Sequence, residues 1–450
     1  MKILIFHGYM LRGTGSNIYN LNLARALARL GHEVHLLCQD RETKIDGVEI
    51  HNPDIHGLLP VYVKDPYAGF EVKTFPELTD EELARYIDAN VAAVRSVAAE
   101  AGDVDAALAN HLVMGPAILA RAGVCDYAVK IHGSALEYTV KPHPRFLPYA
   151  AEGLEAANGV LVGSRHTAES SWSTLPDVPG LTQKTRLGPP GVDTESFRPA
   201  TGPAGRDGPS RVVFVGKLIV SKGVDLLLAA WPMVKSEHPD TKLEIVGYGE
   251  YEDGLRTLLA ALEAGNLDEA RKMAAAGRGL EGGEERPLPI LSAFLANPPE
   301  GYEDACRAAA GSVSFIGRLE HDEVADLLPG AAALVMPSTF PEAFGMVAAE
   351  AAACGVLPVS AGHSGMLEVS RQLRAALPVE VGRLTSFPVE EGAVEAVAER
   401  LNGWLALPGE QRAAAREALV ETARRLWSWE GVARGVIAAS RGDLDRLPDA

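Results

Sequence analysis

The chain opens with a short apolar run that is followed by a helical pattern. Residues 2–6 (KILIF) show no alternation of polar and apolar positions, which is typical of a strand buried on both faces of a sheet. Apolar side chains then recur at helical spacing up to Gly31, a common C-terminal stop for a helix. Strand character resumes at residues 33–37. This order predicts a parallel β–α–β unit.

The same alternation continues along both halves of the chain. Further strands are expected in the first half at 105–109, 127–131 and 160–162, with helices near 81–99 and 144–157. In the second half, strands are expected at 211–215, 242–246, 312–316, 333–336 and 356–360. Strands that alternate with helices predict parallel sheets covered on both faces, so we expect two doubly wound α/β domains.

The composition changes abruptly between the two series of strands. Residues 199–210 hold three Pro and three Gly and no large apolar residue, which predicts a linker. We therefore expect an N-terminal domain at 1–198 and a C-terminal domain at 211–393, followed by helices at 394–450. Residues 265–311 fit neither alternation and are expected to be an insertion, as a surface lobe, an oligomer contact or a flap.

Composition narrows the classes of function. A chain of 450 residues is too long for one compact core and suits two to three domains. With 42 Lys and Arg against 60 Asp and Glu, the formal net charge is −18. This acidity argues against a nucleic-acid partner and against electrostatic docking to an anionic membrane.

The cysteines and the apolar runs indicate the cellular compartment in which the protein is located. The four cysteines are far apart and form no C-x-x-C pair, which fits a reducing cytosol and gives neither a disulfide framework nor a zinc cage. Uncharged apolar runs stay below the length that spans a bilayer. We expect a cytoplasmic protein without stable membrane insertion.

The first candidate site is the loop between the first strand and the first helix. Gly13 and Gly15 begin a dinucleotide fingerprint, but Ile18 occupies the position of its third glycine. Asp40 and Glu42, after the second strand, leave a weak NAD interpretation open. The glycines could also serve only a tight turn. We favour Gly15 as a place where a ligand approaches the helix N-terminus.

Three histidines directly follow predicted strands: His7, His111 and His132. The carboxyl ends of parallel strands meet at one edge of a sheet, so these side chains should converge on one crevice. A single such histidine is usually a hydrogen-bonded structural residue, whereas three favour a functional site. They lack carboxylate partners at metal-ligand spacing, so no metal site is predicted.

A second loop offers cations for a phosphate. Lys217 follows Gly216 at the end of the strand at 211–215, and Lys222 lies five residues further on. Both could face a diphosphate above the next helix N-terminus. The P-loop pattern is absent. The alternative is two solvated surface lysines, which the position at the sheet edge disfavours.

The segment at 337–350 (PSTFPEAFGMVAAE) carries the strongest signal. A helix beginning near Phe344 would direct the N–H groups of Phe344, Gly345, Met346 and Val347 at an anion. Glu350 could accept hydrogen bonds from vicinal hydroxyls such as those of a ribose, and Glu342 faces the crevice. Eight helical residues rise about 12 Å, whereas a retaining glycosidase pair is about 5–5.5 Å apart. A glycosidase is therefore disfavoured.

Taken together, these motifs resemble the retaining glycosyltransferases of family 4. The resemblance rests on the E-x7-E pair Glu342 and Glu350, with support from the segments VGKLIVSKG (215–223), PPGVDTESFRP (189–199), IVGYGE (245–250) and LWSWEGVA (426–433). Residues 15–34 resemble the subgroup of sucrose-phosphate synthases and inositol-phosphate N-acetylglucosaminyltransferases. The resemblance to family 4 implies a GT-B fold, in which two Rossmann-like domains face each other across a cleft. It also implies a final helix that packs back on the first domain.

The resemblance also implies roles for the candidate residues. Lys217, Lys222 and the amides at 344–347 would contact the donor diphosphate, Glu350 the ribose, and Glu342 the donor sugar. His132 matches the family histidine that reaches the transferred sugar. The family usually has Arg at the position of Lys217. Here an ammonium group, which acts as a point charge, replaces a guanidinium group that can donate two parallel hydrogen bonds to a phosphate. Retention without a protein nucleophile, a cofactor or a metal is implied as well.

We therefore expect an enzyme that moves a sugar from a nucleoside diphosphate sugar, with UDP favoured, to a hydroxyl of a small soluble acceptor. A sugar-nucleotide epimerase and a non-catalytic sugar-nucleotide-binding module remain alternatives. Lys73 could meet an acceptor phosphate or be an ordinary surface lysine. The D-x-D triplet at Asp103 and Asp105 is expected to be a strand entry instead of a metal ligand. The sequence leaves the acceptor and the oligomeric state open.

Overall fold

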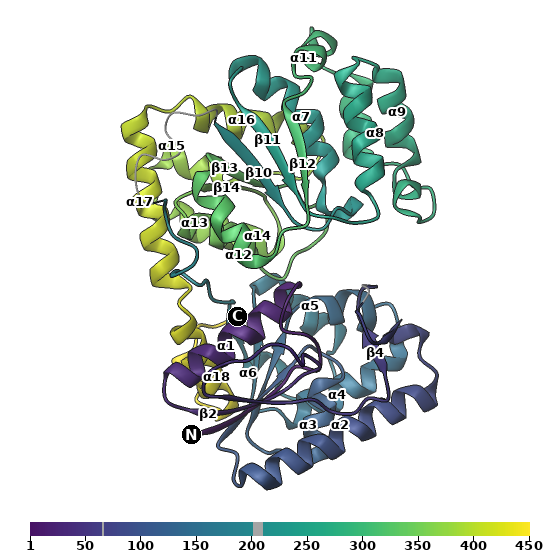
Figure 1. Cartoon of the computed structure of the whole chain (residues 1–450), viewed down its shortest axis with the longest axis vertical. Helices are drawn as coiled ribbons and strands as arrows, with labels where there is room; N and C mark the ends of the chain where they lie inside the picture. The colour runs from purple at the N-terminus through teal and green to yellow at the C-terminus, as the bar shows by residue number, and fades with distance from the viewer. Residues whose placement is uncertain (65–66, 201–209) are drawn as a thin grey trace. The chain divides into compact units, whose positions relative to one another are not determined.

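The computed structural model describes residues 1–64, 67–200 and 210–450, which form two compact units (Figure 1). The first unit comprises residues 1–191 and 427–450, and the second comprises residues 192–426. Of the linker expected at 199–210, positions 201–209 lie outside the described residues. The C-terminal segment joins the first unit only from Trp427, and not from residue 394 as expected.

The reason for this late return is the packing of two helices in the second unit. Helix α16 (Ala393–Leu405) packs against α7 (Val224–Glu237), and α17 (Gly409–Leu426) packs against α13 (Met346–Ala353). Trp404 of α16 is fully buried and its indole donates to the carbonyl of Ala332, 2.8 Å away. The apolar faces of both helices are therefore part of the second core.

The first unit is built on a seven-stranded parallel sheet in the order β3-β2-β1-β6-β7-β8-β9. The strands are β1 (Lys2–Phe6), β2 (Glu33–Leu37), β3 (Val48–His51), β6 (Ala106–Asn110), β7 (Tyr127–Ile131), β8 (Gly159–Val162) and β9 (Thr185–Leu187). The order reverses beside β1, whose neighbours are β2 and β6, so the sheet is doubly wound. A separate parallel pair is formed by β4 (Leu58–Val61) and β5 (Glu71–Thr74).

Helices cover both faces of this sheet. Their bounds are α1 (Gly15–Arg29), α2 (Asp80–Ala101), α3 (Gly115–Ala122), α4 (Leu147–Ala156), α5 (Arg165–Thr174), α6 (Leu181–Lys184) and α18 (Trp429–Ser440). Alternate residues of β1 enter different cores: Ile3 and Ile5 pack toward α1, and Leu4 and Phe6 toward α2. Helix α18 lies beside α1 (Figure 1). The final helix thus completes the core on that face.

The second unit repeats this plan on a six-stranded parallel sheet in the order β12-β11-β10-β13-β14-β15. The strands are β10 (Arg211–Val215), β11 (Lys242–Val246), β12 (Val313–Gly317), β13 (Ala333–Met336), β14 (Leu357–Ala361) and β15 (Ser386–Phe387). The other helices are α8 (Glu252–Glu263), α9 (Leu267–Ala276), α10 (Pro289–Ala296), α11 (Tyr302–Ala308), α12 (His321–Leu327), α14 (Ser364–Arg374) and α15 (Val379–Gly382). Two doubly wound Rossmann-like units confirm the predicted fold class.

The segment expected as an insertion, 265–311, folds into helices α9, α10 and α11. Helix α9 packs against α8, and α11 packs against α7 (Figure 1). The buried hydroxyl of Tyr302 in α11 donates to the carbonyl of Ala229, 2.7 Å away. The segment therefore extends the helical layer of the second unit. Within the described residues, every helix is either too short or too polar to cross a lipid bilayer.

Candidate active site

Two loops at the carboxyl end of the second sheet are locked together. Gly223, before α7, has a positive φ of 66°, and a Cβ atom there would lie 2.1 Å from the carbonyl oxygen of Pro337. Only glycine fits this position. The amide of Thr339 also donates to the carbonyl of Ser221, 2.9 Å away. These contacts hold the lysine loop at 216–223 against the loop that follows β13.

The two loops bring together two of the predicted catalytic side chains. The ammonium group of Lys222 forms an ion pair with the carboxylate of Glu342. The same carboxylate oxygen, Oε1, accepts a hydrogen bond of 3.0 Å from the hydroxyl of Ser338. The side chains of Lys222 and Glu342 remain 25% and 24% exposed, so a ligand can reach both.

A third loop fixes the backbone at Glu342. Its amide donates to the hydroxyl of Ser364 (2.9 Å), and its carbonyl accepts from the amide of Gly365 (2.9 Å). A Cβ atom on Gly365 would lie 2.5 Å from the carbonyl oxygen of Ala343. The close approach of these two backbones explains why glycine follows Ser364. Glu342 is thus held on both sides of its Cα atom.

Helix α13 begins two residues later than the sequence predicts. Gly345 is its N-cap and Met346 its first residue, so Phe344 and Gly345 precede the helix. The N–H groups of Met346 and Val347 lie in the first turn, where a helix supplies no acceptor of its own. Gly345 is buried, and a Cβ atom there would be 3.5 Å from Met366. The N-terminus of α13 therefore lies beside Glu342, and Phe344 lies in the loop before it.

The strand end at Gly216 is anchored through its backbone. The amide of Gly216 donates to the carbonyl of Val246 (3.0 Å), and that of Leu218 to the carbonyl of Tyr248 (2.8 Å). The amide of Gly216 is therefore already engaged within the protein. Lys217 lies between these two anchored residues and is half-buried.

Glu350 is paired with a histidine that sequence reasoning missed. The Glu350 side chain is only 5% exposed, and its Oε1 atom lies 3.0 Å from Nε2 of His321, the first residue of α12. Burial alone would lower the pKa of His321, but the hydrogen bond and charge of Glu350, with Asp193 and Asp322, raise it. The ring of Phe197 lies 4.8 Å from that of His321. His321 and Glu350 are 29 residues apart in the chain, so the pattern of apolar positions could not predict their contact.

In the first unit, the predicted histidine His132 ends a buried chain of hydrogen bonds. Its Nε2 atom is 2.8 Å from Oδ1 of Asn110, whose Nδ2 donates to Oδ1 of Asn20 (2.7 Å). Asn20 Nδ2 lies 3.0 Å from Nδ1 of His7, whose Nε2 is 3.0 Å from Asn17 Oδ1. Two of the three predicted histidines are thus joined through side-chain amides.

Backbone carbonyls fix the orientation of the asparagine amides in this series of hydrogen bonds. Nδ2 of Asn110 also donates to the carbonyl of Phe6 (3.1 Å), and Nδ2 of Asn20 to that of Ser16 (2.8 Å). The oxygen Oδ1 of Asn110 must therefore accept a hydrogen bond from the N–H group at Nε2 of His132. Burial, reinforced by His111, Lys130 and His7, holds the pKa of His132 well below its usual value. The ring is consequently neutral and leaves Nδ1 as an acceptor.

His111 lies between these rings without joining the chain. It is 2% exposed, and both of its ring nitrogens are buried without a hydrogen-bond partner among the described residues. Its ring centroid lies 4.9 Å from that of His132 and 5.9 Å from that of His7. Burial and the neighbouring His7 hold its pKa well below the usual value. His111 therefore acts as a neutral packing element against the His132 ring.

Lys130 is a second residue near His132 that the sequence analysis did not identify. It is 2% exposed, and its ammonium group donates to the carbonyl of Gly188 and faces the ring of Tyr19, 5.5 Å from the centroid. Burial lowers the pKa of Lys130 to about 7. The sequence does mark Lys130, because it is the charged residue in an otherwise apolar strand, YAVKI.

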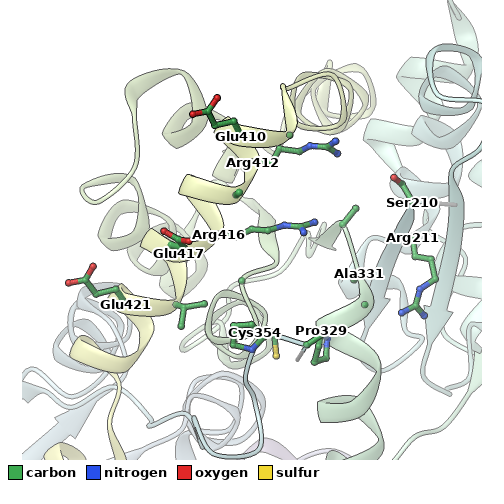
Figure 2. Close-up of a pocket in the computed structure, with 18 of the residues that line it drawn as sticks. Ser210, Arg211, Pro329, Ala331, Cys354, Glu410, Arg412, Arg416, Glu417 and Glu421 are labelled. Atoms are coloured by element: carbon green, nitrogen blue, oxygen red, sulfur yellow. The ribbon is translucent and has the colours of Figure 1, made fainter. Parts of the chain in front are cut away.

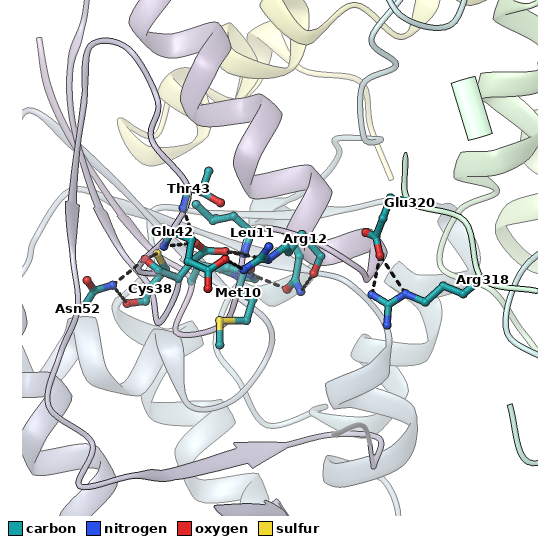
Figure 3. A network of polar contacts seen from close by, with 12 residues as sticks. Met10, Leu11, Arg12, Cys38, Glu42, Thr43, Asn52, Arg318 and Glu320 are labelled. Atoms are coloured by element: carbon teal, nitrogen blue, oxygen red, sulfur yellow. Dashed lines mark hydrogen bonds and ion pairs between the residues drawn. The ribbon is translucent and has the colours of Figure 1, made fainter. Parts of the chain in front are cut away.

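Gly15 is the exposed first residue of α1. Of the two acidic residues nearby, Glu42 is exposed and forms an ion pair with Arg12 (Figure 3). Oδ1 of Asp40 accepts from the amides of Glu42 (3.0 Å) and Thr43 (2.8 Å), and Oδ2 accepts from the amide of Leu11 (3.2 Å). Burial would raise the pKa of Asp40, but these backbone hydrogen bonds lower it. Asp40 ties two loops together, which removes the basis of the NAD interpretation.

Two further predictions concern charged residues of the first unit. Lys73 pairs with Glu82 at 2.6 Å and with Glu71 at 3.3 Å, so its charge is already neutralised. This arrangement fits an ordinary surface lysine.

Asp105 accepts a hydrogen bond of 2.7 Å from the amide of Lys2, and its own amide donates to the carbonyl of Lys2. The D-x-D triplet is therefore a strand entry, as predicted.

A cavity of about 1160 Å³ in the second unit lies beside α17 and contains none of the predicted site residues (Figure 2). Its wall includes Arg412 and Arg416, interleaved with Glu410, Glu417 and Glu421. Ala200 and Ser210, which also line it, flank the residues that are not described. We therefore place the candidate site at the loops of Lys222 and Glu342 and not in this cavity.

Comparison with known families matches both units. The profile described as "Glycosyltransferase Family 4" matches residues 13–196, and "Glycosyl transferases group 1" matches residues 202–267 and 306–425. The second match resumes at 306 after a gap, and the unmatched residues fall within the expected insertion at 265–311. Together the two profiles account for most of the chain.

Individual relatives are more distant. A D-inositol 3-phosphate glycosyltransferase of Frankia alni is 28% identical over 76% of this chain and 76% of its own length. A glycogen synthase of Mycobacterium tuberculosis is 30% identical over 39% of this chain, and the match spans only 31% of that protein. The sucrose-phosphate synthase of Thermosynechococcus elongatus covers 99% of this chain and 98% of its own, with 20% identity and a TM-score of 0.58. Anabaena HepE in complex with UDP and glucose covers 97% and 98%, with 15% identity and a TM-score of 0.59.

Proposed function

Because the chain belongs to glycosyltransferase family 4 and has the GT-B fold, we propose that it transfers a sugar from a UDP-sugar to a hydroxyl of a small soluble acceptor. The observation that carries this proposal is the pairing of Lys222 with Glu342 beside the N-terminus of α13. A cation, the first-turn amides of a helix and a carboxylate at one strand end suit a diphosphate and a sugar hydroxyl. UDP is favoured by the subgroup resemblance and by HepE, which was solved with UDP.

The proposed chemistry depends on the charge that develops on the leaving diphosphate. When the glycosidic bond breaks, negative charge builds up on the phosphate oxygen. Lys222, Lys217 and the first-turn amides of Met346 and Val347 stabilise that charge. Residues that bind the developing charge more tightly than the substrate lower the barrier.

The carboxylates would hold the donor by its hydroxyl groups. Glu350 would accept hydrogen bonds from the ribose, with the imidazole of His321 keeping its carboxylate oriented. Glu342 would exchange its contact with Lys222 for a hydroxyl of the donor sugar. His132, neutral and held by Asn110, would accept a hydrogen bond from a substrate hydroxyl at Nδ1. Transfer would proceed with retention and without a metal, the leaving phosphate taking the proton of the acceptor.

A direct test incubates the protein with UDP-, GDP- and ADP-sugars and a panel of acceptors that includes inositol phosphates and sugar phosphates. We expect a UDP-sugar to give a product one hexose heavier than one acceptor by mass spectrometry, with the anomeric configuration of the donor by NMR. A donor converted without any acceptor would instead indicate an epimerase. Nucleotide binding without turnover on the whole panel would indicate a non-catalytic module.

A further inference from the structure

A second cluster of ligand-type side chains lies on the edge of the first sheet. Strands β2 and β3 pair in parallel with His35 opposite Glu49 and Leu37 opposite His51. Residues two apart on a strand share a face, so Glu49 and His51 project on the same side as His35. Nδ1 of His35 lies 3.1 Å from Nε2 of His51 and 3.5 Å from Oε2 of Glu49.

These separations match the geometry of a tetrahedral metal site. With metal–ligand bonds of about 2.0–2.1 Å, two ligand atoms of a tetrahedral site are about 3.3 Å apart. The two distances from His35 Nδ1, 3.1 and 3.5 Å, bracket this value, and all three ligand atoms lie within 4.8 Å of one another. The backbone register therefore sets the ligand spacing, with no rearrangement of the strands required.

A second carboxylate orients the central imidazole. Nε2 of His35 lies 3.2 Å from Oε1 of Glu33, two residues earlier on the same strand. A carboxylate accepts from the N–H of a neutral imidazole, so this contact directs the other nitrogen, Nδ1, as a lone pair toward Glu49 and His51. His35 is 5% exposed, whereas the side chain of Glu49 is 65% exposed. A buried ligand and an exposed one leave room for water as a fourth ligand.

We propose that His35, Glu49 and His51 bind a zinc-class dication that joins edge strand β3 to β2. Two imidazoles and one carboxylate form a ligand set that suits Zn²⁺, Ni²⁺ or Cu²⁺ and is poorly matched to Mg²⁺ or Ca²⁺. The site shares no residue with the glycosyl-transfer machinery and is structural. The proposal departs from the sequence analysis, which expected no metal in this chain.

The test measures zinc binding by the full-length chain after treatment with a chelator. Equilibrium dialysis against Zn²⁺, with metal content read by elemental analysis, gives stoichiometry and affinity. Co²⁺ in place of Zn²⁺ reports tetrahedral coordination through its visible absorption bands. The variants are His51→Gln, which removes a ligand, and Glu33→Gln, which removes the orienting carboxylate. His56→Asn is the matched control: it removes a 67% exposed imidazole beside a single carboxylate, Asp54, and asparagine tolerates its positive φ of 54°.

We expect one Zn²⁺ per chain in the wild type and in His56→Asn, and tetrahedral Co²⁺ bands in both. Affinity should fall about 100-fold in His51→Gln and about tenfold in Glu33→Gln. Zinc should raise the melting temperature of the wild type and leave that of His51→Gln unchanged. His51→Gln and Glu33→Gln should both keep the wild-type circular dichroism spectrum. Wild-type protein without stoichiometric zinc would overturn the proposal, and so would equal affinity in His51→Gln and the wild type.

Discussion

Nε2 of His132 lies 2.8 Å from Oδ1 of Asn110, and this contact determines which nitrogen of the imidazole carries the proton. The amide of Asn110 cannot rotate, because its Nδ2 is already committed to the carbonyl of Phe6 and to Asn20. His132 therefore presents Nδ1 as an acceptor. In the proposed mechanism Asn110 is a positioning residue, since it would act on substrate only through His132.

Replacement of Asn110 by alanine should reduce kcat about tenfold, with a smaller change in KM for the donor, because His132 loses its fixed tautomer. Nitrogen-15 NMR of the imidazoles should show His132 as the Nε2–H tautomer in the wild type and as a mixture in Asn110→Ala. Asn90→Ala is the control, since Asn90 is an equally buried amide that donates to Tyr86 in α2. An equal loss of kcat in Asn90→Ala would reduce Asn110 to a stability role.

Lys222→Ala should lower turnover on the order of 100-fold or more, because it removes a cation from the developing phosphate charge. Steady-state kinetics with the best donor and acceptor measure the effect. Lys272→Ala serves as the control: Lys272 is a surface residue paired with Glu269 in α9, and its loss changes the net charge by the same amount. Near-normal turnover in Lys222→Ala would remove this lysine from the mechanism.

Glu342→Gln should separate nucleotide binding from transfer. The substitution frees Lys222 from its ion pair and removes a negative charge next to the diphosphate site, so UDP should bind roughly fivefold more tightly, about 1 kcal/mol. Turnover should fall, since the hydroxyl contact of Glu342 with the donor sugar is lost. Calorimetric titration with UDP and kinetics measure the two effects.

Glu391→Gln, an exposed position with the same change in net charge, is the control for this experiment. Weaker UDP binding in Glu342→Gln would contradict the view that Glu342 competes with the diphosphate for Lys222. Equal tightening in Glu391→Gln would show that the effect comes from net charge alone.

The His321–Glu350 pair should stabilise the protein more at acidic than at alkaline pH. The pKa of His321 is raised in the folded state, so the stabilisation is fully present below its unfolded value of about 6.5 and is lost as the pH rises through the folded value. The difference in unfolding free energy between the wild type and His321→Gln should be larger at about pH 6 than at about pH 8.5. Urea unfolding followed by tryptophan fluorescence measures it. A difference that grows with pH would be inconsistent with a charged pair.

The buried strands were predictable from the sequence, because a parallel strand covered on both faces has a nearly continuous apolar sequence. ILIF and VVFV are such sequences, and both lie in central strands. Edge strand β3 is only half-buried and four residues long, so VEIH carries no such signal. Without β3 there is no register between His35 and Glu49, and the proposed metal site cannot be found from the sequence.

Part of the candidate site was predictable from the sequence. Lys217, Lys222, Glu342 and Glu350 follow from strand ends and from the family motif. His321 and Lys130 do not, because their contacts with Glu350 and Tyr19 depend on how separate strands and helices pack. Helix α13 was expected to begin near Phe344 but begins at Met346, because the backbone at Gly345 is not helical, with φ −109° and ψ 70°.

The central claim is that this chain binds a nucleoside diphosphate at the loops of Lys222 and Glu342. A thermal-shift panel of UDP, GDP and ADP, with and without their sugars, tests it most directly when run on the wild type and on Lys222→Ala. We predict a rise in melting temperature with UDP and UDP-sugars that is strongly reduced in Lys222→Ala. No shift with any nucleotide, or an equal shift in both proteins, would contradict the account.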